Sequence, residues 1–156
     1  MKKLIPVIIG VLMLTGCSSR KNVNEKAYLR AASADGRKMT FVFYSTEDIP
    51  LTVTADDPEK AISEAELSLG REIFTGHTEL ILLRNCDKQA VLEYVLRKWK
   101  VSPTCMVAET ETPCEEILNN KTPGQITGEI KVAQEKGIAE KCDIITVLGE
   151  LLRSGE

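Results

Sequence analysis

The first 16 residues have the pattern of an export signal, which leaves only the residues after them to form a folded domain. Met1-Lys2-Lys3 is a short basic start, residues 4–14 are an apolar run, and Thr15-Gly16 is a small-residue ending. This order of charge, apolar segment and small-residue cleavage site is typical of a removable signal. The apolar run has about a dozen residues, whereas a permanent membrane helix needs roughly 20.

Cys17 follows this segment directly, in a setting that resembles the bacterial lipobox. The motif is Leu14-Thr15-Gly16-Cys17, a thiol beside small residues just beyond the apolar run. In proteins with this motif the thiol receives a diacylglycerol, and cleavage leaves the cysteine as the first residue. The resemblance implies that Cys17 anchors the protein to the outer face of the cytoplasmic membrane. An ordinary secretory signal with a chance cysteine, or an uncleaved anchor, is the alternative.

The chain beyond the signal is acidic. Two of the 20 basic side chains, Lys2 and Lys3, belong to the signal, and the rest stand against 23 acidic ones. We therefore expect a net charge of about −5 after cleavage. A nucleic-acid-binding protein needs a basic face, and a polybasic lipid-binding patch needs clustered lysine and arginine. We expect neither here.

Residues 17–26 are polar and lack periodicity, which predicts a short tether, and residues 27–156 are enough for a single domain. Five stretches have the composition of strands. They lie at residues 27–34, 38–45, 51–55, 79–83 and 104–108. Asp35-Gly36 predicts a tight hairpin between the first two. The third is short and alternating, so we expect it at an edge. The last two are mostly apolar, so we expect them to be covered on both faces.

Apolar residues at helical spacing occupy the segments between and after these strands. Asp57-Pro58 is typical of a helix start and Gly70 of a helix end, while Asp87 caps a second helix. The apolar positions of that second helix are Ala90, Val91, Tyr94, Val95 and Trp99. Three further helices are expected over residues 113–118, 125–134 and 143–153. The order predicts an α+β fold, a mixed sheet of about five strands with helices packed against it.

Four cysteines remain besides Cys17: Cys86, Cys105, Cys114 and Cys142. An even number in an exported protein allows disulfides, with three ways of pairing all four. No two of them form a C-x-x-C pair, and the chain has a single histidine, so a zinc site of the usual spacing is not expected. Without pairing, they are expected to act as small buried apolar residues.

The sequence offers little for catalysis, and we expect neither a cofactor nor a metal. His77 would need a thiol and an orienting group beside it to act in a Cys-His hydrolase; we expect a structural histidine at the entry to a buried strand. Three acidic pairs could act as acid and base. They are Asp56/Asp57, Glu109/Glu111 and Glu115/Glu116, and each has an ordinary explanation as a helix cap, a strand end or a first helical turn.

Arg97-Lys98-Trp99-Lys100 is a local basic cluster that contains an aromatic residue. One interpretation is a contact patch for a partner or for lipid headgroups. The other, which we prefer, is a helix C-terminus, where cations complement the helix dipole.

Several of these features, taken in order, resemble the N-terminal domain of the Ger(x)C spore germination lipoproteins, the C subunits of nutrient germinant receptors. The similarity begins with Cys17 and the polar linker. It continues through residues 23–25, 27–35, 58–71, 74–82, Arg97, 107–109, 114–118 and 144–152. Residues 74–82 resemble the family's aromatic-x-Gly-His segment, which leads into a buried strand. The case depends on order and spacing, because no single motif is diagnostic.

The resemblance implies a non-catalytic, lipid-anchored subunit whose partners are the integral-membrane A and B subunits of a germinant receptor. In spores its place would be the inner spore membrane. Full-length family members are longer and carry two further domains, and Ser18 stands where the family often has tryptophan. The one-domain form would be an accessory subunit, a paralogue with another role or a remnant. The alternatives are a small-molecule-binding or other envelope lipoprotein and, less favoured, a small envelope hydrolase.

Overall fold

The protein is described by a computed structural model, which covers residues 26–45 and 49–154. The predicted signal, Cys17 and most of the predicted tether lie outside these residues. The strands are β1 (Ala27–Asp35), β2 (Lys38–Phe43), β3 (Leu51–Thr54), β4 (Ile73–Phe74), β5 (Leu80–Arg84) and β6 (Met106–Glu109). The helices are α2 (Pro58–Leu69), α3 (Lys88–Arg97), α4 (Cys114–Asn120), α5 (Pro123–Glu135) and α6 (Ile144–Ser154).

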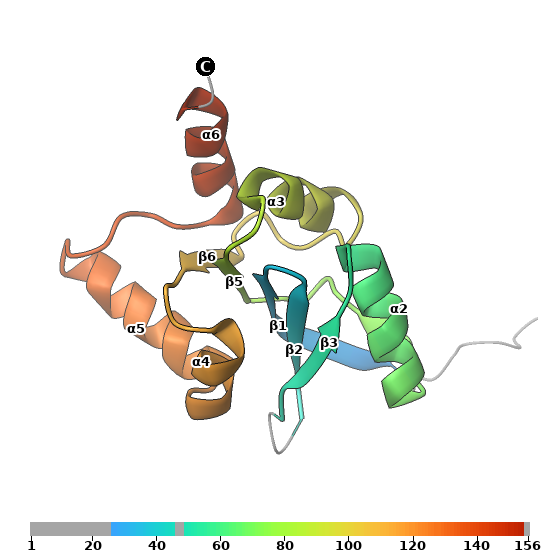
Figure 1. The fold of residues 1–156 in the computed structure, drawn as a ribbon. Helices are drawn as coiled ribbons and strands as arrows, with labels where there is room; N and C mark the ends of the chain where they lie inside the picture. The colour runs from blue at the N-terminus through green and yellow to red at the C-terminus, as the bar shows by residue number, and fades with distance from the viewer. Residues whose placement is uncertain (1–25, 46–48, 155–156) are drawn as a thin grey trace, which may run out of the picture.

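The strands form one mixed sheet in the order β3-β2-β1-β5-β6 (Figure 1). β1, β2 and β3 are antiparallel neighbours, whereas β5 and β6 run parallel to β1 because each follows a helical crossover. Gly36 turns the β1–β2 hairpin with a φ of 59°, in the left-handed region that glycine tolerates. The predicted α+β fold with a mixed sheet is confirmed, as is the edge position of β3.

Helices α2 and α3 begin where the sequence predicted their caps. Asp57 accepts a hydrogen bond from the amide of Lys60 at the start of α2, and Asp87 accepts one from the amide of Ala90 at the start of α3. Such side chains satisfy amides that the first helical turn leaves without partners. The predicted stop at Gly70 is also present, with a φ of 63°.

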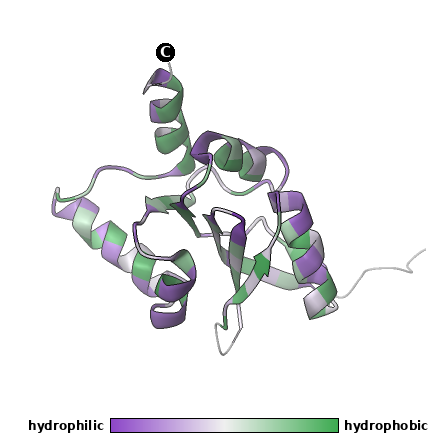
Figure 2. Ribbon diagram, in the orientation of Figure 1, coloured by the Kyte–Doolittle hydropathy of each residue, from purple (hydrophilic) through white to green (hydrophobic). Residues whose placement is uncertain are grey.

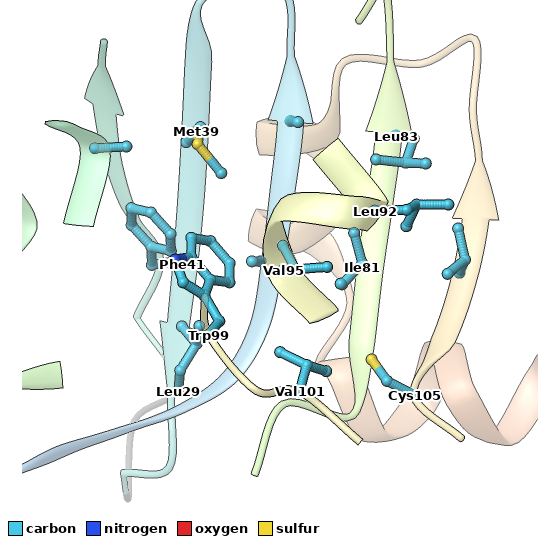
Figure 3. Close-up of a cluster of buried hydrophobic side chains, with 14 of the residues drawn as sticks. Leu29, Met39, Phe41, Ile81, Leu83, Leu92, Val95, Trp99, Val101 and Cys105 are labelled. Atoms are coloured by element: carbon cyan, nitrogen blue, oxygen red, sulfur yellow. The ribbon is translucent and has the colours of Figure 1, made fainter. Parts of the chain in front are cut away.

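The sheet is covered on both faces, so the molecule has two apolar clusters. Successive residues of β5 alternate between them: Ile81 and Leu83 belong to the larger cluster, Leu80 and Leu82 to the smaller. Helices α2, α3 and α6 contribute to the larger cluster, and α4 and α5 to the smaller. Figure 3 shows the larger cluster, in which Phe41 and Trp99 lie side by side with ring centroids 6.1 Å apart.

Three details differ from the sequence-based expectations. β4 was not expected; it is a two-residue strand that pairs with β1 in parallel at Ala27 and Tyr28. β6 is an edge strand and is covered less completely than expected: Val107 is buried in the larger cluster, whereas Met106 and Ala108 are only partly buried against the smaller one. In α3 the buried positions are Leu92 and Val95, whereas Ala90 is exposed because its side of the helix faces solvent.

Helix α6 stands out from the rest of the domain at the C-terminal end (Figure 1) and is mostly apolar (Figure 2). Its first residue, Ile144, is fully buried in the larger cluster, next to an antiparallel bridge between Met106 and Asp143. Asp143 accepts hydrogen bonds from the amide and hydroxyl of Thr146, which fixes the start of the helix. Within residues 26–45 and 49–154, no helix has both the length and the apolar character needed to cross a membrane.

Candidate functional site

The loop that carries His77 lies between β4 and β5, at the end of the sheet where β1 and β5 begin. Hydrogen bonds fold this loop tightly: the Thr78 hydroxyl donates to the carbonyl of Thr75 at 2.7 Å, and the Thr75 hydroxyl donates to the carbonyl of Trp99 at 2.7 Å. The amide of Glu79 donates to the carbonyl of Arg30 on β1. The loop is therefore held against both the sheet and the segment after α3, which fixes the position of His77.

Four aromatic side chains gather around this loop, and we call Tyr28, Tyr44, Phe74 and His77 the aromatic patch. The ring centroids of Phe74 and His77 are 5.2 Å apart, those of Tyr28 and Phe74 5.5 Å, and those of Tyr28 and His77 6.1 Å. The hydroxyl of Tyr44 donates to the carbonyl of His77 at 3.3 Å. These separations are those of interacting aromatic pairs.

A polar cavity of about 530 Å³ lies beside the patch, lined among others by Arg30, Tyr44, His77 and Glu79. The Nε of Arg30 is 3.3 Å from a carboxylate oxygen of Glu79, and the guanidinium lies 5.3 Å from the centre of the Tyr44 ring. The Arg30 side chain also lies against Gly124 of α5, where a Cβ would come within 2.6 Å of its Nη2. Glycine at this position therefore leaves room for the arginine.

The Tyr44 hydroxyl is held in its neutral form. Burial, together with a hydrogen bond to Glu79 and the charge of that carboxylate, raises the pKa of Tyr44 to about 12. The tyrosine is therefore a hydrogen-bonding group near neutral pH and carries no charge. The cavity can hold a small polar or ionic group, but the Arg30 guanidinium and the Glu79 carboxylate in its lining already neutralise each other.

Cys105 lines the same cavity as His77, so these two residues are the candidates for the catalytic pair of a Cys-His hydrolase. Burial raises the pKa of the Cys105 thiol to about 12, the opposite of what a thiolate nucleophile requires. Among the described residues, no hydrogen bond joins the His77 ring to a thiol; the Cys105 thiol donates to the carbonyl of Met106 at 3.7 Å. The pair is not arranged for nucleophilic catalysis.

Cys86, Cys105, Cys114 and Cys142 are free thiols in the structure. Cys105 and Cys114 are buried in different apolar clusters, on opposite faces of the sheet. Burial raises the pKa of the Cys114 thiol to about 11, and it also raises the pKa values of Cys86 and Cys142. All four thiols are therefore mainly protonated near neutral pH.

The acidic pairs lie on the surface in ordinary structural roles. Asp57 caps α2, and Asp56 pairs with Arg37 at 2.5 Å. Glu109 pairs with Lys88, and Glu115 lies in the first turn of α4. Within the described parts of the chain, no three histidine, cysteine or acidic side chains are grouped so that they could hold a metal ion.

The basic cluster after α3 has the structure of a helix end. The backbone amide of Lys98 donates to the carbonyl of Tyr94, and Arg97 pairs with Glu93 of the same helix at 3.6 Å. Trp99 is buried against Phe41 and Tyr94, so it is part of the core and is not available at the surface. The helix-terminus interpretation is the one that the geometry supports.

The aromatic patch was missed by the sequence analysis, although part of its signal was present. The amide of Tyr44 donates to the carbonyl of Tyr28 across the predicted hairpin, so pairing the two strands would have placed these tyrosines together. Phe74 and His77 are close in sequence. What could not be foreseen is that β4 pairs with β1, which brings the two pairs of residues into one cluster.

Comparison with known families gives one result. A family model described as the spore germination protein N-terminal domain matches residues 20–156, which is most of the chain. The match includes the aromatic patch and every described strand and helix. Neither the curated proteins nor the solved structures gave a significant match.

Proposed function

Because the chain belongs to the family of spore germination protein N-terminal domains, we propose that it is a lipid-anchored, non-catalytic subunit of a germinant receptor complex, or an accessory to one. The observation that carries the proposal is the match over residues 20–156, which supports a role in spore germination. The match also confirms the resemblance to the Ger(x)C N-terminal domain.

The proposed mechanism is tethering followed by protein–protein contact. A diacylglycerol on Cys17 holds the domain at the outer face of the cytoplasmic membrane, or at the inner membrane of the spore. Confinement to that plane raises its effective concentration near integral-membrane A and B subunits. The geometry of the described residues is compatible with this role, because the side chains that could act in catalysis have structural partners or raised pKa values.

Substitution of Cys17 tests the mechanism. In the native host, Cys17→Ala is expected to release the protein from the membrane fraction and to slow germination, because the thiol that receives the lipid is gone. Cys142→Ala is the matched control: it removes a partly exposed thiol of the folded domain and should leave both properties unchanged. Normal membrane retention together with a normal germination rate in Cys17→Ala spores would show that the mechanism is wrong.

Binding of a small solute is the second candidate, and the polar cavity beside His77 favours it. It ranks lower because Arg30 and Glu79 already form an ion pair there. A solute that uses these groups should raise the melting temperature of the wild type but not that of Arg30→Met. Glu129→Gln, which alters a surface ion pair elsewhere, is the control.

A further inference from the structure

The aromatic patch places a large share of this chain's few aromatic residues near the surface. The sequence has three phenylalanines, three tyrosines, one tryptophan and one histidine. The patch contains three of the seven phenylalanine, tyrosine and tryptophan residues, together with the histidine. Two of its rings are exposed to solvent, since Phe74 is 37% exposed and Tyr44 is 44% exposed. The other four aromatic residues line the larger core cluster. Aromatic side chains are normally buried, and a contiguous exposed group of them marks a surface that binds a partner or a membrane.

We propose that the aromatic patch lies against the membrane and inserts its side chains at the level of the lipid headgroups. This inference rests on the proposed lipidation of Cys17 and adds an orientation to it. The patch is the membrane-facing surface of the domain.

The covalent connection of the chain supports this orientation. Tyr28 is the second residue of β1, and Cys17 precedes Ala27 by 10 residues in the sequence. Ten residues span at most about 35 Å when fully extended, and a flexible chain of that length has an r.m.s. span of roughly 17 Å. A lipid on Cys17 therefore holds the beginning of β1, and the patch with it, close to the bilayer. In Figure 1 β1 begins at the lower right, where the chain enters the domain.

The chemistry of the patch suits the interface between headgroups and acyl chains. Tyrosine has an apolar ring with a polar tip and is enriched at this level of membranes. Ile49, which is 65% exposed, lines a shallow hollow together with Tyr28 and Tyr44, so the apolar surface extends beyond the rings.

Two ion pairs lie near the patch, and the other basic side chains that line the adjoining hollows, Arg71 and Lys131, are single cations in separate hollows and do not form a cluster. Lys26 pairs with Glu72 at 3.3 Å, and Arg30 pairs with Glu79 at 3.3 Å. A surface of this kind gains little from the negative potential of anionic lipids, which attracts unbalanced basic clusters. Contact with the membrane is therefore expected to depend on the aromatic side chains and to be similar on neutral and anionic vesicles.

A tryptophan placed in the patch tests the proposal. The full chain is produced in its native host as Phe74→Trp, its lipidation is read by mass spectrometry, and it is reconstituted into phosphatidylcholine vesicles with or without brominated acyl chains. Ile138→Trp is the matched control, since Ile138 is 77% exposed on the connection between α5 and α6. The native Trp99, which is 7% exposed, also fluoresces, and its contribution is measured in the chain without an added tryptophan. Tyr44→Trp is the second patch variant, in case Phe74→Trp does not fold.

We expect the patch tryptophan to lose fluorescence in brominated vesicles and to emit at shorter wavelength, while the Ile138→Trp signal stays unchanged. A lipidated, vesicle-bound chain whose patch tryptophan is no more quenched than Ile138→Trp overturns the membrane contact and leaves the anchor intact. A shift to shorter wavelength without quenching also overturns it and indicates a protein surface, such as a second copy, on the patch. A mass without lipid on Cys17 overturns the proposed anchor, and this inference with it.

Discussion

Asp35 and Arg84 join the two central strands of the sheet. They face each other in the β1–β5 register, and Nη1 of Arg84 lies 2.9 and 3.2 Å from the two carboxylate oxygens of Asp35. Arg84 also donates through Nε to the carbonyl of Glu111, and the amide of Cys114 donates to Asp35 at 3.4 Å. The pair is mostly buried, so both charges depend on these partners more than a surface pair does.

Asp35→Ala is therefore expected to lower the free energy of unfolding by about 1–3 kcal/mol, because it leaves the Arg84 guanidinium and an amide without their acceptor. Urea unfolding followed by circular dichroism measures the change. Asp56→Ala removes an exposed carboxylate that pairs with Arg37, and should cost at most about 1 kcal/mol. Equal losses in the two variants would contradict the structural role of the buried pair.

The Cys105 thiol makes stability depend on pH in the alkaline range. Burial is the largest cause of its raised pKa, with smaller contributions from Glu79 and Cys142, and the value moves from 9.0 to about 12. The folded protein therefore holds this proton more tightly than the unfolded chain. Its stabilising effect is complete below pH 9 and is lost as the pH rises from about 9 towards 12.

The free energy of unfolding should accordingly fall between pH 9 and 11, by up to about 1.4 kcal/mol per pH unit for one such thiol. Cys105→Ala should reduce this slope, and the other three thiols, whose pKa values are also raised, contribute the remaining thiol-dependent part. Val107→Ala is the control, because it shortens a nearby buried side chain of the same cluster without removing a titrating group. It should lower stability at every pH and keep the slope; a slope that is unchanged in Cys105→Ala would refute the assignment.

At the scale of the element, α6 has one strong attachment to the domain. Ile144 is fully buried, while its neighbour Ile145 is 55% exposed. Val147, Leu148 and Leu151 are partly buried against the same cluster. The helix is therefore held mainly at its first turn, and it should open more easily in hydrogen exchange than the central strands.

The two neighbouring isoleucines give a direct test of this attachment. Ile144→Ala should lower the free energy of unfolding by about 2–5 kcal/mol and speed amide exchange in α6, because it opens a cavity in the core. Ile145→Ala makes the same chemical change at an exposed position, and we expect a shift within about 0.5 kcal/mol. Chemical denaturation and exchange mass spectrometry measure both. Similar losses in the two variants would mean that α6 packs differently from the structure.

At the scale of the whole molecule, the two apolar clusters share one sheet. Adjacent residues of β5, Ile81 and Leu82, are buried on opposite faces and belong to different clusters. Neither cluster can open without exposing the strand that both use. The described domain should therefore unfold as one cooperative unit, which small single domains usually do.

Ile81→Ala and Leu82→Ala should each cost about 2–5 kcal/mol, because both create cavities in well-packed clusters. In each variant the unfolding curves from Trp99 fluorescence and from far-ultraviolet circular dichroism should coincide. Ile138→Ala, at an exposed position, should leave the midpoint nearly unchanged. A fluorescence transition separated from the dichroism transition would show that the two clusters unfold independently.

Local chemistry in the sequence determined most of the elements and several of their ends. Asp57 and Asp87 were readable as helix caps because a cap bonds to an amide three residues away, and Asp35-Gly36 was readable as a turn because the turn needs only its own residues. The same holds for the signal and Cys17, whose pattern is continuous in the chain. The lipid on Cys17 remains a prediction.

Only the tertiary structure decided which elements meet. The edge position of β6 follows from the strand order, and the pairing of β4 with β1 joins residues more than 40 positions apart. That pairing creates the aromatic patch, whose four side chains come from two strands, the residue after β2 and a loop. Long-range pairing depends on how all the elements pack together, and the spacing of residues within any one segment does not encode it.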